Sequence, residues 1–286
     1  MDPSTLSGKH ILVTGGGSGL GLDMAARFAE LGATVSVCGR SEEKLASSKE
    51  EILSRSASGR VFTHAADVRD YNSVSEMAEK LEQDGGVING LVNNAAGNFL
   101  AASEDLSPNG FKAVVDIVLT GSFNCSQVIG KRLIEQNLKG SILNIVTTYT
   151  QTGSAFVLPS ACAKAGVEAM TNSLAYEWGT YGIRVNAIAP GPFPTEGAWS
   201  RLMPDPKMEQ AYQARIPGGR YGEKWELSNL AAFMMSDLSP YMTGATIPID
   251  GGERLNAGQF NFIAQMAPRE EIKKVFEQMK KESGKK

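Results

Sequence analysis

Glycine is concentrated in one short run near the start of the chain, Thr14-Gly15-Gly16-Gly17-Ser18-Gly19-Leu20-Gly21. An apolar run typical of a strand, His10–Val13, precedes it, and helical apolar spacing follows over Leu22–Leu31. A strand, a glycine turn and a helix N-terminus aim backbone N–H groups at an anion, and a Cβ in the turn would hold a phosphate away. We therefore expect Gly15 to Gly21 to bind the pyrophosphate of a dinucleotide, with a flexible turn as the alternative.

A basic residue stands where the ribose of such a dinucleotide would lie. The second predicted strand, Ala33–Cys38, continues into Gly39-Arg40-Ser41, and no acidic residue follows before Glu42. NAD enzymes usually place a carboxylate here for the 2′-hydroxyl, whereas a 2′-phosphate needs a cation. A guanidinium holds a phosphate with paired, charge-assisted hydrogen bonds. Arg40 thus favours NADPH as the cofactor, with an ordinary surface arginine as the alternative.

Three further turns follow predicted strands. The first is Asp67-Val68, where the aspartate suits an acceptor for the adenine amino group. The second is the small-residue turn Asn93-Asn94-Ala95-Ala96-Gly97, and the third is Pro190-Gly191-Pro192-Phe193, after the sixth predicted strand. The carboxyl ends of parallel strands share one sheet edge, where ligands bind in open α/β folds. We therefore expect the cofactor to be contacted by residues of all three turns: Asp67, Val68, Asn94, Pro190, Gly191, Pro192 and Phe193.

The elements that hold these turns predict a doubly wound α/β fold. Helical apolar spacing, as in Ser73–Gln83 and Ala163–Tyr181, alternates with short apolar runs, which implies a parallel sheet covered by helices. No linker or internal repeat divides the chain, so we expect a single Rossmann domain over residues 1–286 with a seven-stranded parallel sheet. The predicted strands are His10–Val13, Ala33–Cys38, Arg60–Ala65, Gly90–Asn93, Ser141–Thr147, Arg184–Ala189 and Ile247–Asp250.

Two regions break this alternation. Residues 191–222 carry five prolines and follow the sixth predicted strand, which favours a substrate lid over a disordered connection. Residues 253–286 form a C-terminal extension with an amphipathic pattern and a lysine-rich end. Cations suit the negative pole of a helix, so we expect a solvated terminal helix there, with a partner-binding element as the alternative.

Composition narrows the functional classes. With 42% hydrophobic and 21% charged residues, the 286-residue chain fits a globular protein, and its net charge of −3 gives no case for nucleic-acid binding. No run approaches the ~18 consecutive apolar residues of a membrane span. The start has no signal-peptide or transit-peptide character, and the three cysteines have no metal-ligand spacing. We expect a cytoplasmic protein without a metal, a nucleic-acid partner or a membrane partner, although a processed organellar protein would look the same.

In order and spacing, these motifs resemble the short-chain dehydrogenase/reductase family over about residues 8–252. That family's usual signature is Tyr-x-x-x-Lys, but here the stretch is Ser160-Ala161-Cys162-Ala163-Lys164. Thr147 stands where the family has a serine, and Val118 stands where it has a helical asparagine. A serine hydroxyl cannot replace the phenol as an acid, because its pKa lies far above the tyrosine value of ~10. The chain is then either a degraded dehydrogenase or a hydride-transfer enzyme whose proton is handled elsewhere.

This departure is similar to the 2,4-dienoyl-CoA reductase subgroup, in its mitochondrial type. The resemblance is dense in residues 93–99, 147–149 and 159–166. It implies NADPH-dependent hydride transfer to C5 of a 2,4-dienoyl-CoA and reprotonation at C2 to a 3-enoyl-CoA, in unsaturated fatty acid β-oxidation. The working tyrosine falls at Tyr149, which the peroxisomal relatives lack, and Asn98 joins it in binding the thioester oxygen.

Other roles follow from the same resemblance. Lys164 would position the nicotinamide ribose, and Ser160 would support the local hydrogen-bond network. Asp116 would help water or proton delivery, with a structural ion pair as the alternative. The expected substrate residues near acyl-CoA and its acyl channel are Arg69, Phe99, Ser107 and Arg201.

Plainer explanations exist for these residues. Tyr149 could be a core aromatic residue, Asn98 could cap its turn, and Arg69 or Arg201 could simply be a solvated surface residue.

The common assembly of the family implies that this protein is a homotetramer.

Two other functions compete. A different short-chain reductase, such as a 3-oxoacyl thioester reductase, is disfavoured by the missing tyrosine before Lys164. A non-catalytic NADP-binding regulator is disfavoured by the retained lysine.

Overall fold

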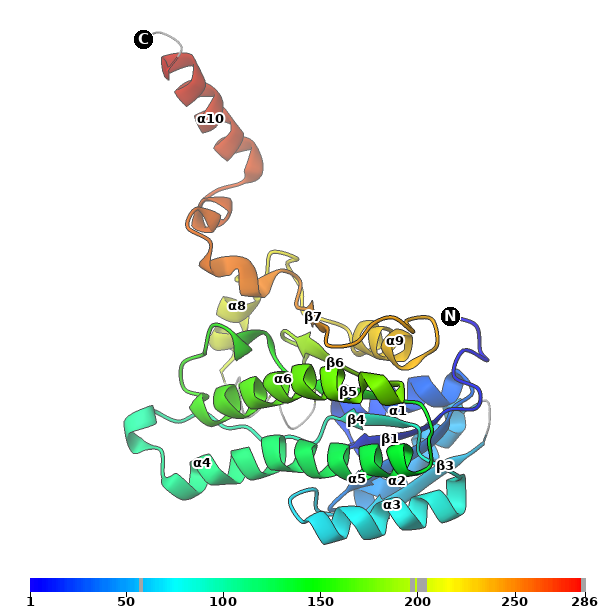
Figure 1. Cartoon of the computed structure of the whole chain (residues 1–286). Helices are drawn as coiled ribbons and strands as arrows, with labels where there is room; N and C mark the ends of the chain where they lie inside the picture. The colour runs from blue at the N-terminus through cyan, green and yellow to red at the C-terminus, as the bar shows by residue number, and fades with distance from the viewer. Residues whose placement is uncertain (57–58, 196–198, 200–204, 284–286) are drawn as a thin grey trace.

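Seven parallel strands form one sheet in the spatial order β3-β2-β1-β4-β5-β6-β7 (Figure 1). The computed structural model describes residues 1–56, 59–195, 199 and 205–283. Every predicted strand is present with its ends shifted by at most two residues, so the predicted fold class is confirmed. The strands are β1 (His10–Thr14), β2 (Thr34–Gly39), β3 (Val61–Ala65), β4 (Gly90–Asn93), β5 (Gly140–Ile145), β6 (Ile183–Pro190) and β7 (Thr246–Ile249).

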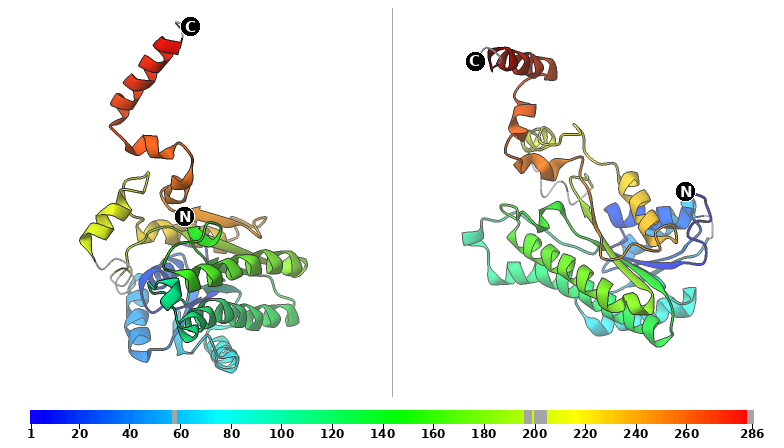
Figure 2. Two further views of the ribbon diagram at one scale, coloured as in Figure 1. Left: turned by 90° about the vertical axis from the view of Figure 1, so that its left-hand side faces the viewer. Right: turned by 45° about the horizontal axis from the view of Figure 1, so that its top comes forward.

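Helices cover both faces of the sheet (Figures 1 and 2). Helices α1, α2 and α9 pack on one face through Phe28, Ile52 and Met234, and α3, α5 and α6 pack on the other. The sheet serves both layers because successive side chains of a strand point to opposite faces. The helices are α1 (Gly19–Glu30), α2 (Glu42–Arg55), α3 (Tyr71–Gly85), α4 (Pro108–Val115), α5 (Gly121–Glu135), α6 (Leu158–Trp178), α8 (Pro206–Gln213), α9 (Lys224–Met235) and α10 (Arg269–Ser283).

Strand register brings apolar residues into rows across the sheet. Leu12 of β1 lies beside Leu91 of β4, which lies beside Ile142 of β5. These three side chains belong to the core under α3, α5 and α6, whereas the neighbouring row of Val13, Val92 and Leu143 belongs to the core under α1 and α9. The two-sided core fixes the carboxyl ends of the strands at a single edge, where the predicted site residues lie.

Helix α6 starts five residues earlier than the spacing predicts, at Leu158 rather than Ala163. Pro159 lies in its first turn, where the missing N–H would have had no partner within the helix. The earlier start places Ser160 on the helix itself, one turn before Lys164.

The C-terminal extension stands away from the sheet and its helices (Figures 1 and 2). It comprises η5 (Glu253–Ala257), η6 (Asn261–Gln265) and α10, in which Ile272 is buried while Val275, Phe276 and Met279 are at least half exposed. A terminal helix is present as expected, but its apolar side is largely open.

One helical stretch, Pro108–Glu135, is long and apolar enough to cross a membrane by length and composition. Of its most apolar window, 56% is buried inside the fold. The core helix of a globular α/β fold passes the same test, so this stretch is weak evidence for a membrane span.

Candidate active site

The glycine turn between β1 and α1 is shaped for an anion. Gly15 and Gly19 adopt left-handed backbone angles, with φ of 64° and 58°. A Cβ on Gly21 would lie 2.5 Å from both the Asn94 side-chain nitrogen and the Gly15 carbonyl oxygen. The N-cap residue Ser18 makes no side-chain cap, and the first turn of α1 carries no acidic residue. The first N–H groups of α1 are therefore open to a ligand, and the turn fits a dinucleotide pyrophosphate.

Thr14 and Asn94 join this turn to the one after β4. The Thr14 hydroxyl accepts the backbone N–H groups of Asn94 and Ala95, both at 3.0 Å. The Asn94 side chain in turn donates to the carbonyl oxygens of Thr14 and Gly15, at 3.0 and 3.3 Å. Asn94 therefore shapes the predicted cofactor edge through its contacts with the glycine turn.

Arg40 is exposed at the end of β2, where the ribose was expected. It forms no salt bridge with any described residue. Asp67, after β3, instead pairs with Arg69: the Arg69 Nε lies 2.9 Å from each Asp67 carboxylate oxygen. The hydrogen bond from Arg69 holds the pKa of Asp67 below its usual value. Arg69 and Asp67 are held in an ion pair, whereas Arg40 forms no ion pair with a described residue and acts on Asp67 only through its charge, which also lowers the pKa of that carboxyl group.

Tyr149 and Ser160 meet beside the buried lysine. Tyr149 lies in η3 (Thr148–Thr150), directly after β5, and its hydroxyl is 3.0 Å from the Ser160 hydroxyl on α6. Lys164 follows one turn later on α6 and donates to the Ile145 carbonyl at the end of β5. Burial lowers the pKa of the Lys164 ammonium group to about 8. A partly buried phenol, a serine hydroxyl and a lysine thus converge on one edge of the sheet.

Asn98 and Phe99 lie on the rim of this site, on the loop after β4. The Asn98 side-chain oxygen accepts the Phe99 backbone N–H at 2.9 Å, which is the turn-capping alternative. Its amide nitrogen makes no hydrogen bond with any residue that the structure describes. Phe99 is partly buried against the core of Val114 and Val118, between α4 and α6. Val118, at the position where the family has an asparagine, therefore packs against other apolar side chains.

Asp116 and Ser107 take structural roles in the observed arrangement. Asp116 pairs with Lys112, one turn earlier, at 2.5 Å. Ser107 is the N-cap of α4 and accepts the Gly110 N–H at 3.0 Å. Asp116 also begins the π-helical segment η2 (Asp116–Thr120). Arg201, the remaining predicted substrate residue, lies outside the described residues.

The segment after β6 closes the cofactor edge. The Gly191 N–H donates to the Ile249 carbonyl at 2.9 Å, and the Pro192 carbonyl accepts the Gly222 N–H at 3.0 Å. Phe193 is buried, and a Cβ on Gly222 would lie 2.4 Å from its ring. The two ends of the region predicted as a lid are therefore joined at its base.

Between those ends, aromatic packing organises α8. Trp199 lies edge-on to Tyr221, with ring centroids 4.9 Å apart, and stacks on Tyr212 at 6.3 Å. Burial raises the pKa of Tyr212 to about 12, and the nearby Glu253 and Tyr149 act in the same direction. Tyr212 on α8 is therefore packed within an aromatic cluster with Trp199 and Tyr221.

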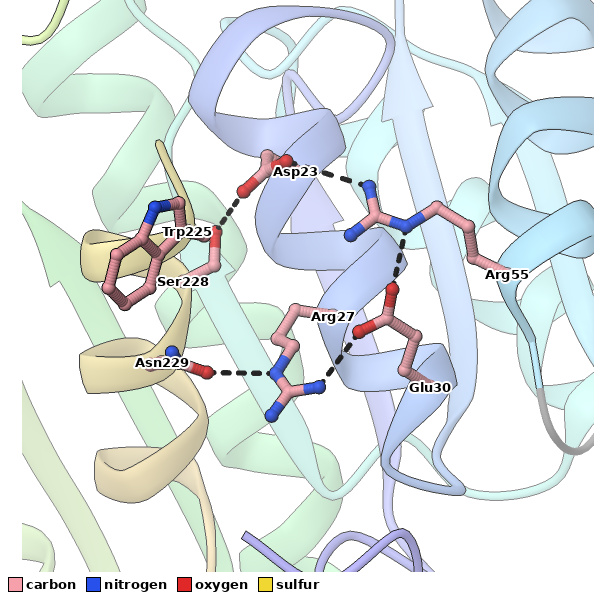
Figure 3. A pocket seen from close by; sticks show the side chains of 7 residues that line it. All are labelled: Asp23, Arg27, Glu30, Arg55, Trp225, Ser228 and Asn229. Carbon is pink, nitrogen blue, oxygen red and sulfur yellow. Dashed lines mark hydrogen bonds and ion pairs between the residues drawn. The ribbon is translucent and has the colours of Figure 1, made fainter. Parts of the chain in front are cut away.

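A cavity of about 270 Å³ lies away from this edge, between α1 and α9 (Figure 3). Its charges are matched: Arg55 pairs with Glu30 and Asp23, at 2.7 and 3.6 Å, and Arg27 pairs with Glu30 at 2.8 Å. Two bonds reach α9, from Arg27 to Asn229 and from Ser228 to Asp23. The cluster fixes α1 against α2 and α9, and so holds the glycine turn in place. The lining residues are Asp23, Arg27, Glu30, Arg55, Trp225, Ser228 and Asn229.

Sequence reasoning missed the polar network beneath the site. Asn93 donates to Ser126 and Asn144, and Asn144 donates to Thr171, each at 2.8 Å. All four residues are buried. Buried polar side chains in adjacent strands were the available signal, but their partners lie on α5 and α6, far away in the sequence. Thr14 was recognised as part of the glycine-rich run, but its hydrogen bonds to Asn94 and Ala95 were not predicted, since these residues lie far away in the sequence.

No group of three or more His, Cys, Asp or Glu that could hold a metal ion occurs in the part of the chain that the structure describes.

Known proteins resemble the chain along most of its length. The family described as enoyl-(acyl carrier protein) reductase matches residues 15–253. A Caenorhabditis elegans protein named probable 2,4-dienoyl-CoA reductase 3, (3E)-enoyl-CoA-producing, is 44% identical over 87% of this chain and 81% of its own length. A Bacillus subtilis protein named probable 2,4-dienoyl-CoA reductase, (2E)-enoyl-CoA-producing, is 44% identical over 88% of this chain and 99% of its own.

Solved structures agree with this similarity. A short chain dehydrogenase from Bacillus anthracis has a TM-score of 0.79 and 44% identity, covering 87% of this chain and 98% of that one. A gluconate 5-dehydrogenase from Burkholderia cenocepacia, in complex with NADP and tartrate, has a TM-score of 0.81 and 30% identity over 88% and 97% of the two chains. Since the glycine turn, the strand order and these matches agree, the chain belongs to the short-chain dehydrogenase/reductase family of oxidoreductases, whose fold binds NAD(P).

Proposed function

We propose that this protein catalyses the NADPH-dependent reduction of 2,4-dienoyl-CoA to 3-enoyl-CoA, a reaction of unsaturated fatty acid β-oxidation. The observation that carries the proposal is the hydrogen bond of 3.0 Å between the hydroxyls of Tyr149 and Ser160. It gives the site a phenol although the usual tyrosine position holds serine. Relatives at 44% identity with 2,4-dienoyl-CoA reductase in their names support the same substrate class.

The side chains divide the work. When bound, NADPH supplies the hydride that reduces C5 of the dienoyl chain. Negative charge then develops on the thioester oxygen, where the Tyr149 hydroxyl and the Asn98 amide donate hydrogen bonds that strengthen in the transition state. Ser160, itself buried in the first turn of α6, holds the phenol in place. Lys164, already buried and fixed to the Ile145 carbonyl, would hold the nicotinamide ribose.

The cofactor preference rests on Arg40. Its exposed guanidinium follows β2, and no acidic residue stands between it and the strand. A 2′-phosphate there gains paired charge-assisted hydrogen bonds, whereas a 2′-hydroxyl gains little. NADPH is therefore the proposed reductant. Val68, Asn94 and the segment from Pro190 to Phe193 complete the cofactor edge.

The position of the product double bond depends on where the proton is added. Hydride at C5 leaves charge shared among the thioester oxygen, C2 and C4. A proton at C2 gives the 3-enoyl thioester and a proton at C4 gives the 2-enoyl thioester. The two relatives differ here, since one name reads (3E)-enoyl and the other (2E)-enoyl. We propose C2, in keeping with a phenol at the thioester end of the site.

The remaining assignments form part of the same proposal. Residues 191–222 act as the substrate lid. Arg69 reaches a CoA phosphate by exchanging its bond to Asp67, and Asp116 reaches the site only by leaving Lys112. Phe99, Ser107 and Arg201 contact the acyl-CoA. The protein works in the cytoplasm as a homotetramer.

An assay with purified protein tests the proposal. We expect 2,4-hexadienoyl-CoA and 2,4-decadienoyl-CoA to be reduced with NADPH and more slowly with NADH. The loss of cofactor absorbance measures the rate. Proton NMR of the product locates its double bond. No turnover of either dienoyl-CoA, together with reduction of a 3-oxoacyl thioester, would contradict the assignment.

A further inference from the structure

Phe156 has a backbone conformation that opposes its side chain. Its φ is 65°, in the left-handed region that L residues other than asparagine and aspartate rarely adopt. Among the described non-glycine residues, Asn137 alone shares a positive φ. Gly153, on the same loop, takes a φ of 70° without a Cβ. Yet the Phe156 ring is 60% exposed, so it contributes little to the core. A side chain this exposed adds little to the packing of the described residues.

The position of Phe156 is fixed by a bond between two site loops. Its carbonyl accepts the Ala101 N–H at 2.9 Å. Ala101 lies on the loop after β4 that carries Asn98, and Phe156 lies on the loop after β5 that carries Tyr149. Both strands are parallel, so both loops leave the same edge of the sheet, on the side of Figure 1 where α4 and α6 begin. Phe156 is therefore part of the mouth of the candidate active site.

Two more apolar side chains are exposed beside it. Leu100 directly precedes Ala101 and is 43% exposed, and Leu158, the first residue of α6, is 41% exposed. We call Leu100, Phe156 and Leu158 the apolar rim. On the order of 9 Å of helix axis separates Leu158 from Lys164, at ~1.5 Å per residue. The rim thus lies at the outer end of the site, beyond the Tyr149–Ser160 pair.

Charge indicates which part of a ligand the rim accepts. The nearest acidic residues on the loop after β4 are Glu104 and Asp105, both exposed in η1 (Ser103–Asp105). Two carboxylates repel the phosphates of a CoA head group. An alkyl chain carries no charge, and its contact with the rim removes apolar surface of both partners from water.

We propose that the apolar rim binds the acyl tail beyond the reacting carbons and makes the enzyme prefer long-chain thioesters. This inference rests on the proposed function for its substrate and assigns a specificity role to Phe156, which is otherwise strained and exposed. The strained backbone holds the ring in one direction at the mouth, so that it contacts a tail long enough to emerge from the site.

Phe156→Ala and Phe156→Gly test the proposal together. Both remove the ring, but glycine also relieves the left-handed backbone. We expect both to lower kcat/KM for 2,4-decadienoyl-CoA about tenfold, with 2,4-hexadienoyl-CoA changed less than about twofold. Phe156→Leu, which keeps an apolar side chain, should retain most of the long-chain preference. Phe156→Gly should also unfold at a higher temperature than Phe156→Ala.

The control is Tyr241→Ala. Tyr241 is fully exposed and precedes β7, so it lies at the amino ends of the strands, opposite the candidate active site. Its replacement should therefore leave kcat/KM for both substrates unchanged. Equal losses on the two chain lengths in the Phe156 variants would place the ring against the pantetheine or Tyr149 and overturn the proposal. No loss on either substrate would overturn it as well.

A second measurement distinguishes failure of the proposed function from failure of the proposal that the apolar rim binds the acyl tail. If the wild-type protein reduces neither dienoyl-CoA, isothermal titration calorimetry with hexanoyl-CoA and decanoyl-CoA measures the same preference. A decanoyl-CoA affinity that is higher than that for hexanoyl-CoA, and falls selectively in Phe156→Ala, supports the rim without the reaction. Equal affinity for the two thioesters in the wild-type protein contradicts it.

Discussion

Tyr149→Phe removes a single hydroxyl and tests the proposed chemistry directly. In the free protein, that hydroxyl makes one neutral hydrogen bond, 3.0 Å long, to Ser160. Such a bond contributes about 1 kcal/mol to stability, so we expect a small decrease in the unfolding temperature. At the transition state, the same hydroxyl faces an oxyanion, where one donor is worth about 3 kcal/mol. This corresponds to a decrease in kcat of about a hundredfold.

Ser160→Ala separates orientation from donation. The phenol remains but loses the partner that fixes its direction, and we expect a decrease in kcat of about fivefold, from one lost neutral hydrogen bond of about 1 kcal/mol. The double variant should be no slower than Tyr149→Phe alone, because Ser160 acts through Tyr149. The three variants are compared by single-turnover stopped-flow reduction of 2,4-hexadienoyl-CoA, with NADPH affinity measured separately by fluorescence. NADPH affinity should change less than about twofold, since neither hydroxyl is assigned to the cofactor.

Two results would refute this reasoning. Activity of Tyr149→Phe within threefold of wild type would remove the phenol from the reaction. A Ser160→Ala variant slower than Tyr149→Phe would make serine the direct participant and tyrosine its support.

Three further predictions concern the cofactor end. Arg40→Ala should lower kcat/KM for NADPH by about tenfold or more and leave that for NADH unchanged, since charge-assisted hydrogen bonds to the 2′-phosphate are lost; an unchanged ratio contradicts the phosphate role. Lys164 has a folded-state pKa lowered to about 8 from 10.5, so the folded state binds fewer protons than the unfolded state between these values. In urea titrations, the free energy of unfolding of the wild-type protein should therefore rise relative to that of Lys164→Met as the pH increases through this range. The expected increase is at most ~1.4 kcal/mol per pH unit. An increase that occurs below pH 8 instead would be inconsistent with a buried ammonium group. Gly21→Ala places a Cβ 2.5 Å from Asn94 and should cost ~1–3 kcal/mol of stability, whereas Gly17→Ala, whose nearest contact is 3.6 Å, should weaken only dinucleotide binding. Thermal unfolding and NADPH titration separate the two effects, and equal destabilisation would mean that Gly17 serves the fold.

The sheet was predictable because its strands are apolar on both faces. A run such as Ile142-Leu143 has no polar side and is stable only between two helical layers, which determines the parallel arrangement. Helix α6 was less predictable at its start, since Pro159 reads as a break in a sequence but is compatible with the first helical turn.

The glycine turn and the position of Arg40 at the end of β2 could be predicted from the sequence, and the resemblance pointed to Tyr149 and Ser160 separately, whereas their hydrogen bond is seen only in the structure. The pairings Arg69–Asp67 and Lys112–Asp116 could not be predicted, because an isolated charged residue gives no sign of whether it faces a ligand or a neighbour. The strain at Phe156 was also invisible, since its neighbours Ala155 and Val157 carry no turn signal. Backbone angles in such a loop follow from its anchors, here the bond from Ala101.

The phenol of Tyr149 is held in place differently from a tyrosine located on α6. On α6, the residue at position 160 lies in the first helical turn and is fixed by burial, at 4% exposure. Tyr149 is instead on a short loop segment, anchored by β5 before it and by the Gly153 N–H bond to its carbonyl after it. Its hydroxyl therefore depends on Ser160 for direction. In the proposed reaction, hydrogen bonding to the thioester oxygen is for this reason expected to depend on the side-chain conformation of Ser160, which a tyrosine fixed within α6 would not require.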